Sequence, residues 1–336
     1  MAGDDWDSLI THHENHSVFH RAAWARILAE TYGHKPIYLC IQKDREDIAL
    51  LPLMELKSML SGNRAVSLPF SDFAGPLWRK QGMQSEVYDY LTQMAVGKNW
   101  KYLEIREEEN AQDLVPSFQV YDGHELDLRD GIESVERNLN PSVRRAIRKA
   151  EKSGLKVSVE GGEEDIRIFY RLHEMTRRRH GLPPQPFSFF RSIGDHLLKK
   201  GMGFVALGRL EGVPVAGAVF LHSRSRAIYK FGASDTAHWS LRPNQLVMWG
   251  AIQHLVASGS HRLHFGRTSR HDDGLNRFKL SWGAASRSVH YTRYNVTSRN
   301  WVAPVPMRAE GHPLIFGHLP AALNRIAGKM IYPHLD

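Results

Sequence analysis

The stretch FVALGRLEGVPVAGAVFLH, residues 204–222, decides how the second half of this chain folds. It holds two runs rich in Val, Phe, Leu and Ala, 204–210 and 214–222, joined by a Glu-Gly pair that favours a tight turn. The pattern predicts two strands of a meander. Downstream patterns predict a third strand, a helix and a fourth strand at 227–234, 243–257 and 262–265.

The first half of the chain shows a similar order of elements. Trp24, Ile27 and Leu28 recur at helical spacing before Gly33, which predicts a helix over 20–32. The patterns therefore predict an α/β (α+β) protein whose second half repeats the element order of the first. The other elements expected in the first half are strands at 37–42, 48–56, 65–70, 102–105 and 118–128 and a helix at 87–96.

A chain of 336 residues is long for one hydrophobic core, so we expect more than one domain. We place a first domain at 1–155, a second domain at 156–298 and a tail at 299–336. In the tail, the run 321–331 places Leu323, Ile326 and Met330 on one side of a helix, which indicates a docking segment. The alternative, that 312–332 lies on a bilayer as a peripheral membrane contact, is less favoured because this segment has few basic residues.

Composition limits the function classes. Subtracting 36 acidic from 44 basic residues gives a net charge of +8, which favours an anionic small molecule, a nucleotide-linked substrate, tRNA or a membrane surface as partner. No apolar run is long enough to span a bilayer and residues 1–7 are acidic, so we expect a cytoplasmic protein. Cys40 is the only cysteine, and His12, His13, His16 and His20 lack accompanying carboxylates, so we expect no metal site.

A basic helix is predicted between the two halves. Asn140 is a capping residue followed by proline, and Gly154 is a natural stop. Arg144, Arg148 and Lys152 recur at i, i+4 and i+8, which places them on one face. Like charges on one face repel each other, so this face favours a phosphate-bearing partner; a solvated helix is the alternative. The basic run 177–179 needs no ligand, since cations suit the last turn of a helix.

The segment 264–283 holds the strongest candidate for chemistry. It begins at the end of a predicted strand, where sites of α/β proteins usually lie, and its Gly, Ser, Asp and basic residues indicate a loop. Lys279 stands between Phe278 and Leu280, so it would place a cation against an apolar wall; a surface lysine is the alternative. Asp235 and His238 follow another predicted strand and are candidates for a general base, and Asn244 is a candidate substrate-binding residue.

The sequence GLNRFK, residues 274–279, resembles a Gly-Leu-Tyr-x-Phe-Lys-like motif of the Fem family of peptidoglycan-bridge aminoacyltransferases. Further similarities are Trp24-Ala25 in the opening helix, the basic helix from Arg144, and three segments at 67–72, 179–181 and 186–190. The resemblance implies two tandem acetyltransferase-like (GNAT-like) domains, each a mixed, mostly antiparallel sheet flanked by helices. It also implies that the tail returns to the first domain.

The resemblance implies transfer of an acyl or aminoacyl group to an amine of a cell-envelope precursor or related acceptor. Lys279 would stabilise the reacting carbonyl, with Phe278 beside it. Gln185 stands at the position where characterised members have an arginine that contacts the nucleotide diphosphate of the precursor. At the positions of Arg267 and Arg106, the sequence is more similar to a broad branch of N-acyltransferases. Some members of this branch are linked to exopolysaccharide or envelope assembly. The donor is then aminoacyl-tRNA or acyl-CoA, with no tightly bound cofactor.

Two other functions compete with this interpretation. An acyl-CoA-dependent N-acetyltransferase would need a glycine-rich turn for the pyrophosphate, and the corresponding segment 235–244 has no glycine. A non-catalytic protein that binds RNA or anionic glycans would use the basic residues 144–152 and 177–179. That function explains the charge but gives no role to Phe278-Lys279.

Overall fold

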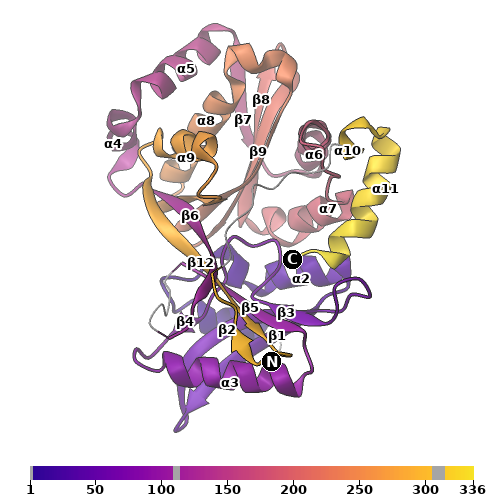
Figure 1. The fold of residues 1–336 in the computed structure, drawn as a ribbon. Coiled ribbons are helices and arrows are strands. Elements are labelled where there is room, and N and C mark those ends of the chain that lie inside the picture. The colour runs from indigo at the N-terminus through magenta and orange to yellow at the C-terminus, as the bar shows by residue number, and fades with distance from the viewer. Residues whose placement is uncertain (1–2, 109–113, 305–314) are drawn as a thin grey trace. The chain divides into compact units, whose positions relative to one another are not determined.

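The computed structural model describes residues 3–108, 114–304 and 315–336 (Figure 1). Its chain divides into two compact units. Unit 1 comprises Met1–Asp122, Arg287–Ala309 and Ile331–Asp336, and unit 2 comprises Gly123–Ser286 and Glu310–Met330.

The division differs from the predicted domains at both ends. The sequence-based boundary fell after residue 155, whereas the helices before it pack through Val135, Val143 and Ile147 into the core of unit 2. The predicted tail 299–336 is shared between the units: residues 299–309 and 331–336 belong to unit 1, and residues 310–330 belong to unit 2.

Unit 1 is a sheet covered on both faces. Successive residues of a strand point to opposite faces, and so Leu50 packs against Trp6 and Ile10 while Leu51 packs against the helix that carries Val87. The sheet order is β1 (Lys35–Lys43), β2 (Glu46–Leu56), β3 (Arg64–Val66), β5 (Tyr102–Glu107) and β12 (Ala285–Asn295), with β4 (Leu77–Trp78) on β2 and β13 (Asn300–Trp301) on β12. The helices are α1 (Gly3–Ile10), α2 (Ala22–Tyr32) and α3 (Gln84–Gly97), with short 3-10 turns at η1 (Val18–His20) and η4 (Tyr332–His334).

Unit 2 repeats this topology. In unit 1, β1, β2 and β3 are antiparallel neighbours and β5 is parallel to β3. In unit 2, β8 (Gly203–Leu210), β9 (Val213–Ser223) and β10 (Arg226–Ser234) are antiparallel neighbours and β11 (Arg262–Thr268) is parallel to β10. The duplicated element order expected from the sequence is therefore confirmed. Two further strands complete this part of the sheet: β7 (Leu155–Glu160) beside β8 and β6 (Ser117–Asp127) beside β11.

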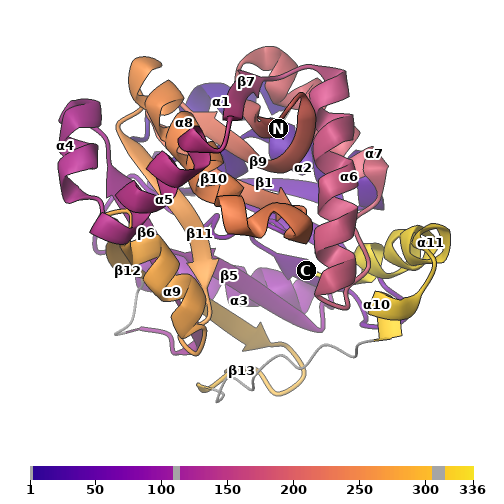
Figure 2. The same ribbon diagram turned by 90° about the horizontal axis from the view of Figure 1, so that it is seen from above.

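Helices cover both faces of the unit 2 sheet, as Figure 2 shows from above. One face carries α6 and α7, whose Phe169, Phe189 and Phe190 form an aromatic cluster with Phe231 of β10. The other face carries α4, α5 and α8. The helices of unit 2 are α4 (Gly131–Asn138), α5 (Pro141–Lys152), α6 (Glu163–Arg179), α7 (Phe187–His196), α8 (Pro243–Ala257), α9 (Asp273–Leu280), α10 (Ile315–His318) and α11 (Ala321–Ile331), with 3-10 turns η2 (Leu198–Lys200) and η3 (Thr236–Leu241).

Two predicted elements differ from the structure. The strand expected over 65–70 ends at Val66, because Leu68 and Phe70 adopt φ of 58° and 57°, values outside the strand region. The segment 264–283 was expected to be a loop, yet β11 extends through Thr268 and α9 begins at Asp273. Asp272 caps this helix, since its carboxylate accepts the backbone N–H of Leu275 at 2.9 Å.

The face of the tail helix that is buried in the structure also differs from the predicted docking face. α11 has the predicted bounds, but its buried residues are Asn324 and Gly328, whereas Leu323, Ile326 and Met330 are exposed. Glycine at 328 permits this close packing of α11, because a Cβ there would come within 2.0 Å of the Pro184 carbonyl oxygen. No helix in the described ranges is both long and apolar enough to span a bilayer.

Candidate active site

The ends of β10 and β11 form an opening in the unit 2 sheet. The two strands are parallel neighbours, and their register runs from Arg226–Arg262 to Ile228–His264. Beyond that point β10 continues to Ser234, paired with β9 to its end, while β11 continues to Thr268. A register shift between Tyr229 and Phe231 marks the place where β10 departs. The carboxyl ends of two parallel strands therefore separate, which is a usual location of a binding site in such sheets.

Ser234, the last residue of β10, joins several elements at this opening. Its hydroxyl accepts hydrogen bonds from Trp239 Nε1 at 2.8 Å and Asn244 Nδ2 at 3.2 Å. Its backbone N–H donates to Thr176 Oγ1 of α6 at 3.1 Å. The Arg179 guanidinium lies over the Trp239 ring, 4.6 Å from its centroid, and burial lowers the pKa of Arg179. A hollow of about 440 Å³ adjoins Ser234 and is lined by residues of α6, α10 and the start of η3.

Asp235 and His238 form an oriented pair directly after Ser234. One carboxylate oxygen of Asp235 accepts the Ala237 N–H at 3.0 Å, which caps η3, and the other lies 3.2 Å from His238 Nδ1. Both side chains are partly exposed. A carboxylate on Nδ1 favours the tautomer with the lone pair on Nε2, and that nitrogen can then accept a proton. The structure thus combines in one turn two of the residues predicted for catalysis.

Lys279 is buried rather than a surface lysine. Its side chain is 2% exposed, and Nζ donates to the backbone oxygens of Gly266 at 2.7 Å and Arg267 at 3.3 Å. Gly266 adopts φ of 76°, a left-handed conformation that suits glycine, at the point where its carbonyl meets the ammonium. These contacts fasten α9 to the end of β11. The Arg267 side chain itself is half-buried.

Phe278 and the basic helix α5 line a second hollow, of about 430 Å³. Phe278 packs edge-on against buried Trp282, with ring centroids 6.2 Å apart. Three cations, Arg145, Lys149 and Arg242, share this hollow with the polar side chain of Gln245. Arg242 adopts φ of 62°, just before α8 begins. A pocket with several cations and an aromatic ring suits a ligand with phosphate and an aromatic base.

The two arginines predicted on α5 take different places. Arg144 is half-buried, and its guanidinium donates to the Leu139 carbonyl at 3.2 Å, so it ties α5 to the end of α4. Arg148 is exposed on the same helix. The cations that reach the hollow, Arg145 and Lys149, lie one residue further along the chain than this pair.

Gln185 anchors a loop. It is 8% exposed, its amide oxygen accepts from His173 Nε2 at 2.8 Å, and its backbone carbonyl accepts the Tyr170 hydroxyl at 3.1 Å. Burial lowers the pKa of His173 to about 3, so this imidazole is neutral and can donate one hydrogen bond. The geometry gives Gln185 the role of holding the Pro-rich loop 182–186 against α6.

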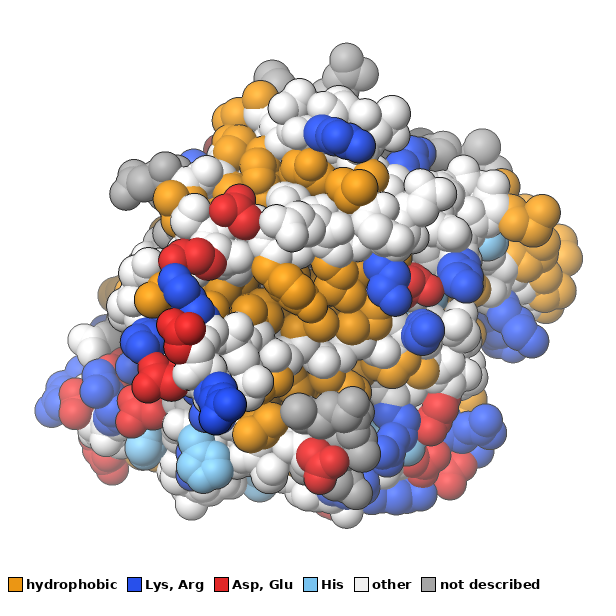
Figure 3. All heavy atoms as spheres, turned by 90° about the horizontal axis from the view of Figure 1, so that it is seen from below, with side chains coloured by type: hydrophobic (Ala, Val, Ile, Leu, Met, Phe, Trp, Pro, Cys, Tyr) orange, Lys and Arg blue, Asp and Glu red, His pale blue; other side chains and the backbone are white. Residues whose placement is uncertain are grey.

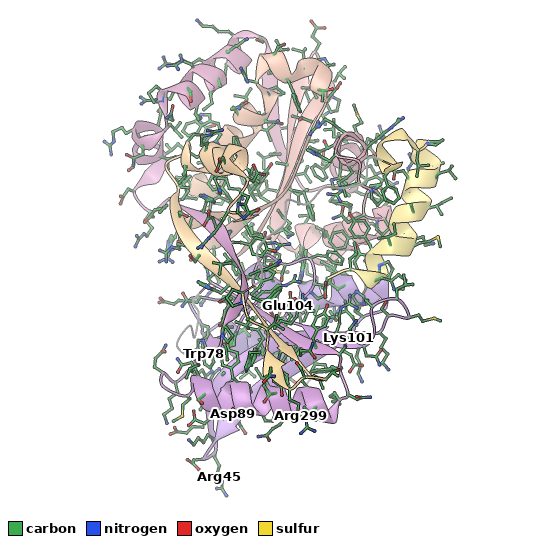
Figure 4. The ribbon with its side chains drawn as sticks, in the orientation of Figure 1. Arg45, Trp78, Asp89, Lys101, Glu104 and Arg299 are labelled. Carbon is green, nitrogen blue, oxygen red and sulfur yellow. The ribbon has the colours of Figure 1, made fainter. Side chains whose placement is uncertain are left out.

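Arg106 lies in β5 of unit 1, and its guanidinium, like the Gln185 amide, is held by partners within the protein. Its Nη2 lies 2.7 Å from Oε1 of Glu104, and its guanidinium stacks on the Tyr291 ring at 4.8 Å. Figure 4 shows Glu104 among the strands of unit 1, whereas Arg45 lies at the tip of the β1–β2 hairpin. The structure therefore places Arg106 in a buried ion pair, where removing one partner would be strongly destabilising.

Sequence reasoning did not identify Ser234 as a hydrogen-bond partner shared by several elements. It also did not assign the cations Lys149 and Arg242 to a pocket. A serine next to a strand end gives no signal of its own. Its partners come from positions about 58 residues upstream and up to 10 residues downstream. Only the spatial meeting of α6, β10 and α8 reveals that these residues belong together.

One family of known proteins matches this part of the chain. Residues 137–280 match the family model described as acetyltransferase (GNAT) domain. The matched range contains Asp235, His238 and Lys279. No curated protein sequence matches the chain.

Solved structures extend the similarity to most of the chain. The chain is similar to FemX at 15% identity, covering 86% of this chain and 95% of that chain, with a TM-score of 0.68. It is similar to L-PGS from Bacillus licheniformis at 12% identity, covering 97% of both chains, with a TM-score of 0.57. A tandem GNAT protein from the clavulanic acid biosynthesis pathway matches at 10% identity over 82% of this chain and 87% of that chain, with a TM-score of 0.51. The chain has a FemX-like fold, as the sequence resemblance predicted, and residues 137–280 match a GNAT domain.

Proposed function

We propose that this chain is an N-acyltransferase that moves an aminoacyl or acyl group from a nucleotide-bearing donor to an amine. The separation of β10 and β11 next to the Asp235–His238 pair supports this function most directly. A split between parallel strands leaves room beside β10 for the reactive end of a donor, next to a base.

The donor's nucleotide end fits the hollow between α5 and α9. Arg145, Lys149 and Arg242 supply positive charge there, and Phe278 supplies an aromatic surface. Both acyl-CoA and the 3′ end of aminoacyl-tRNA carry adenosine and phosphate. Before α8, the 3-10 turn η3 and left-handed Arg242 stand where a CoA-type glycine-rich turn would open the helix. This local backbone favours aminoacyl-tRNA over acyl-CoA as the donor.

The reaction joins the acceptor nitrogen to the donor's carbonyl carbon and breaks that carbon's bond to the leaving oxygen or sulfur. His238 Nε2 would take the proton from the attacking amine and return it to the leaving group. The tetrahedral oxyanion needs a hydrogen-bond donor, and one such donor lowers the activation barrier by about 3 to 4 kcal/mol. Lys279 is our candidate for this donor. Its ammonium would give up a hydrogen bond to a backbone carbonyl and donate to the oxyanion instead.

The acceptor we propose is an amine of a cell-envelope precursor or a related molecule. The similar structures are called FemX and L-PGS, and another with a TM-score of 0.54 is called a putative lysylphosphatidylglycerol synthetase from Agrobacterium fabrum. Those proteins share the fold with this chain. The electropositive hollow near Arg178 and Arg179, beside Ser234, suits an acceptor that carries phosphate or carboxylate.

Ligand-induced thermal shifts test the donor. The protein is heated with acetyl-CoA, with longer acyl-CoAs and with charged tRNA, because a ligand at 100 times its dissociation constant stabilises the folded state by about 2.7 kcal/mol. We expect charged tRNA to raise the melting temperature, and Arg145→Gln/Lys149→Gln to reduce that shift. Lys156→Gln/Lys200→Gln removes two exposed charges elsewhere and should leave it intact. A shift with acyl-CoA alone would assign the other donor.

A non-catalytic binder of RNA or anionic glycans is the second candidate, since α5 exposes Arg145, Arg148, Lys149 and Lys152. Turnover decides between the two functions. If tRNA binds but no acyl group reaches any amine, and His238→Gln binds as tightly as the wild type, the chain is a binder. Transfer that is lost in His238→Gln while tRNA binding persists supports the enzyme.

A further inference from the structure

The helix α11 exposes its apolar side to solvent. Leu323, Ile326 and Met330 are 51%, 56% and 67% exposed, whereas the side that packs on unit 2 consists of Asn324 and Gly328. On a helix of 3.6 residues per turn, the three apolar residues share one stripe that lies opposite the buried pair. Folding alone would place such a stripe inside, so its exposure indicates a contact that the isolated chain does not make.

Basic residues border this stripe. Arg325 and Lys329 of α11 line a hollow of about 520 Å³ together with Arg167 and Arg171 of α6. The one acidic residue of this hollow, Glu174, is paired with Arg325. Arg167 and Arg171 also contact Glu163 and Glu164, but those pairs are exposed, and such pairs contribute little stability. The cations can therefore be shared with an external anion.

The fold supplies the positive charge that the segment 312–332 lacks on its own. The sequence counts against a bilayer-bound segment because this stretch has few basic residues. In the structure, α6 adds Arg167, Arg171 and, in a smaller adjoining hollow, Arg178 beside α11. Juxtaposed cations and an apolar stripe are the features of a helix that lies in the interface of an anionic bilayer.

We propose that α11 and the adjoining face of α6 form a docking surface for an anionic lipid bilayer. Leu323, Ile326 and Met330 would enter the boundary between headgroups and acyl chains, while Arg171 and Lys329 contact lipid phosphates. The proposal goes beyond the acyltransferase function and does not depend on it. On the face of the molecule seen from below, Figure 3 shows hydrophobic side chains over the middle of the view, with acidic and basic side chains interspersed around them.

Co-sedimentation with vesicles tests the docking surface. The full chain should bind vesicles of phosphatidylcholine and phosphatidylglycerol more tightly than vesicles of phosphatidylcholine alone, and salt should weaken the binding. Leu323→Ser/Ile326→Ser/Met330→Ser should lower the partition constant about tenfold or more, since half-exposed apolar side chains are removed. Val213→Ser changes an equally exposed apolar residue elsewhere and should bind like the wild type.

The charge requirement is tested with matched pairs. Arg171→Gln/Lys329→Gln should reduce binding to the anionic vesicles by about fivefold for each charge. Lys156→Gln/Lys200→Gln removes the same net charge from other exposed positions of unit 2 and should have a smaller effect. Equal losses in both variants would mean that net charge alone attracts the protein, which overturns the proposal.

Insertion has its own readout. An environment-sensitive fluorophore on Ile326→Cys, in a Cys40→Ser background, should shift to shorter wavelength with anionic vesicles, while the same label on Val213→Cys should not. Absence of vesicle binding by the wild type refutes the proposal outright. If instead the wild type is a dimer in solution, binds no vesicles, and the triple serine variant is a monomer, the surface binds a second copy and the bilayer assignment fails.

Discussion

Replacing Lys279 by methionine should destabilise unit 2 measurably while leaving its shape intact. Methionine fills a similar volume but cannot donate to the backbone oxygens of Gly266 and Arg267, which lie 2.7 and 3.3 Å from Nζ. A buried acceptor left without a donor costs about 1–3 kcal/mol, and the longer contact is the weaker one. Removing the desolvated charge offsets part of this cost. We therefore expect a loss of about 2–4 kcal/mol in the free energy of unfolding.

Urea denaturation followed by tryptophan fluorescence measures this loss, because Trp282 is fully buried directly after α9. Lys156→Met is the matched control: Lys156 is exposed, so its stability should change by at most about 0.5 kcal/mol. If Lys279→Met unfolds at the wild-type urea concentration, the ammonium does not hold α9 to β11 and our reading of these contacts is wrong.

Activity then separates the two roles of Lys279. An oxyanion donor should lower kcat by about 10²–10³ when it is removed, even at temperatures where the variant is fully folded. A merely structural lysine would give a variant whose activity returns when the temperature is lowered below its unfolding transition. Recovery of near-normal turnover in the folded variant would remove Lys279 from the mechanism.

Three further substitutions test other parts of unit 2. Burial lowers the pKa of His173 to about 3, below its unfolded value near 6.5, so the unfolded chain takes up a proton first and stability should fall by about 2 kcal/mol between pH 7 and pH 5. Unfolding of His173→Phe, followed across this range, should lack that part of the slope; an unchanged slope contradicts the assignment. Gly266→Ala should cost about 1–2 kcal/mol in urea unfolding, because its φ of 76° is unfavourable for alanine; Gly212→Ala, at a hairpin turn with φ of 84°, shows what the same strain costs away from Lys279. Gly328→Ala should expose α11 to limited proteolysis, since its Cβ would clash with Pro184, and protection equal to that of the wild type would show that the helix is seated differently.

Much of the fold could be predicted because it rests on local patterns. The hairpin of β8 and β9 follows from two apolar runs and a Glu-Gly turn, and α5 follows from Asn140, whose side chain accepts the Ser142 N–H. By contrast, α9 lies in a segment whose composition is typical of a loop. It is a helix because Asp272 caps it and Lys279 is bonded to a strand 12 and 13 residues away, and such tertiary contacts leave no periodic signal.

The candidate site was predictable only in part, for the same reason. Asp235 and His238 were found because they follow a strand directly. The separation of β10 from β11 depends on where pairing between distant segments stops, and no residue type marks that point. Likewise, the apolar residues of α11 were assigned to one side correctly, but periodicity does not say whether that side faces protein or solvent.

Comparing the two units supports the placement of chemistry in unit 2. Both contain a strand that runs parallel to its neighbour after an antiparallel meander: β3 with β5, and β10 with β11. In unit 1 the segment after β3 stays bonded to β5: the Ser67 N–H donates to Glu104, the Arg106 N–H donates to the Ser67 hydroxyl, and the Ala74 N–H donates to Arg106. The space that opens in unit 2 is therefore filled by the chain itself in unit 1.

Because of this difference, we expect matching substitutions in the two units to affect stability and turnover differently. In unit 1, Ser67→Ala removes the hydroxyl that accepts the Arg106 N–H, and leaving that buried donor unsatisfied should cost about 1–3 kcal/mol. Because residues 67–74 occupy the corresponding place beside β5 in the described part of unit 1, the folded variant should keep its transfer activity. In unit 2, Ser234→Ala removes the acceptor of Trp239 and Asn244 at the open strand end, so it should lower turnover more than stability. Paired measurements of urea midpoint and kcat on these two serine variants test the argument, and loss of activity in folded Ser67→Ala would show that unit 1 takes part in the chemistry.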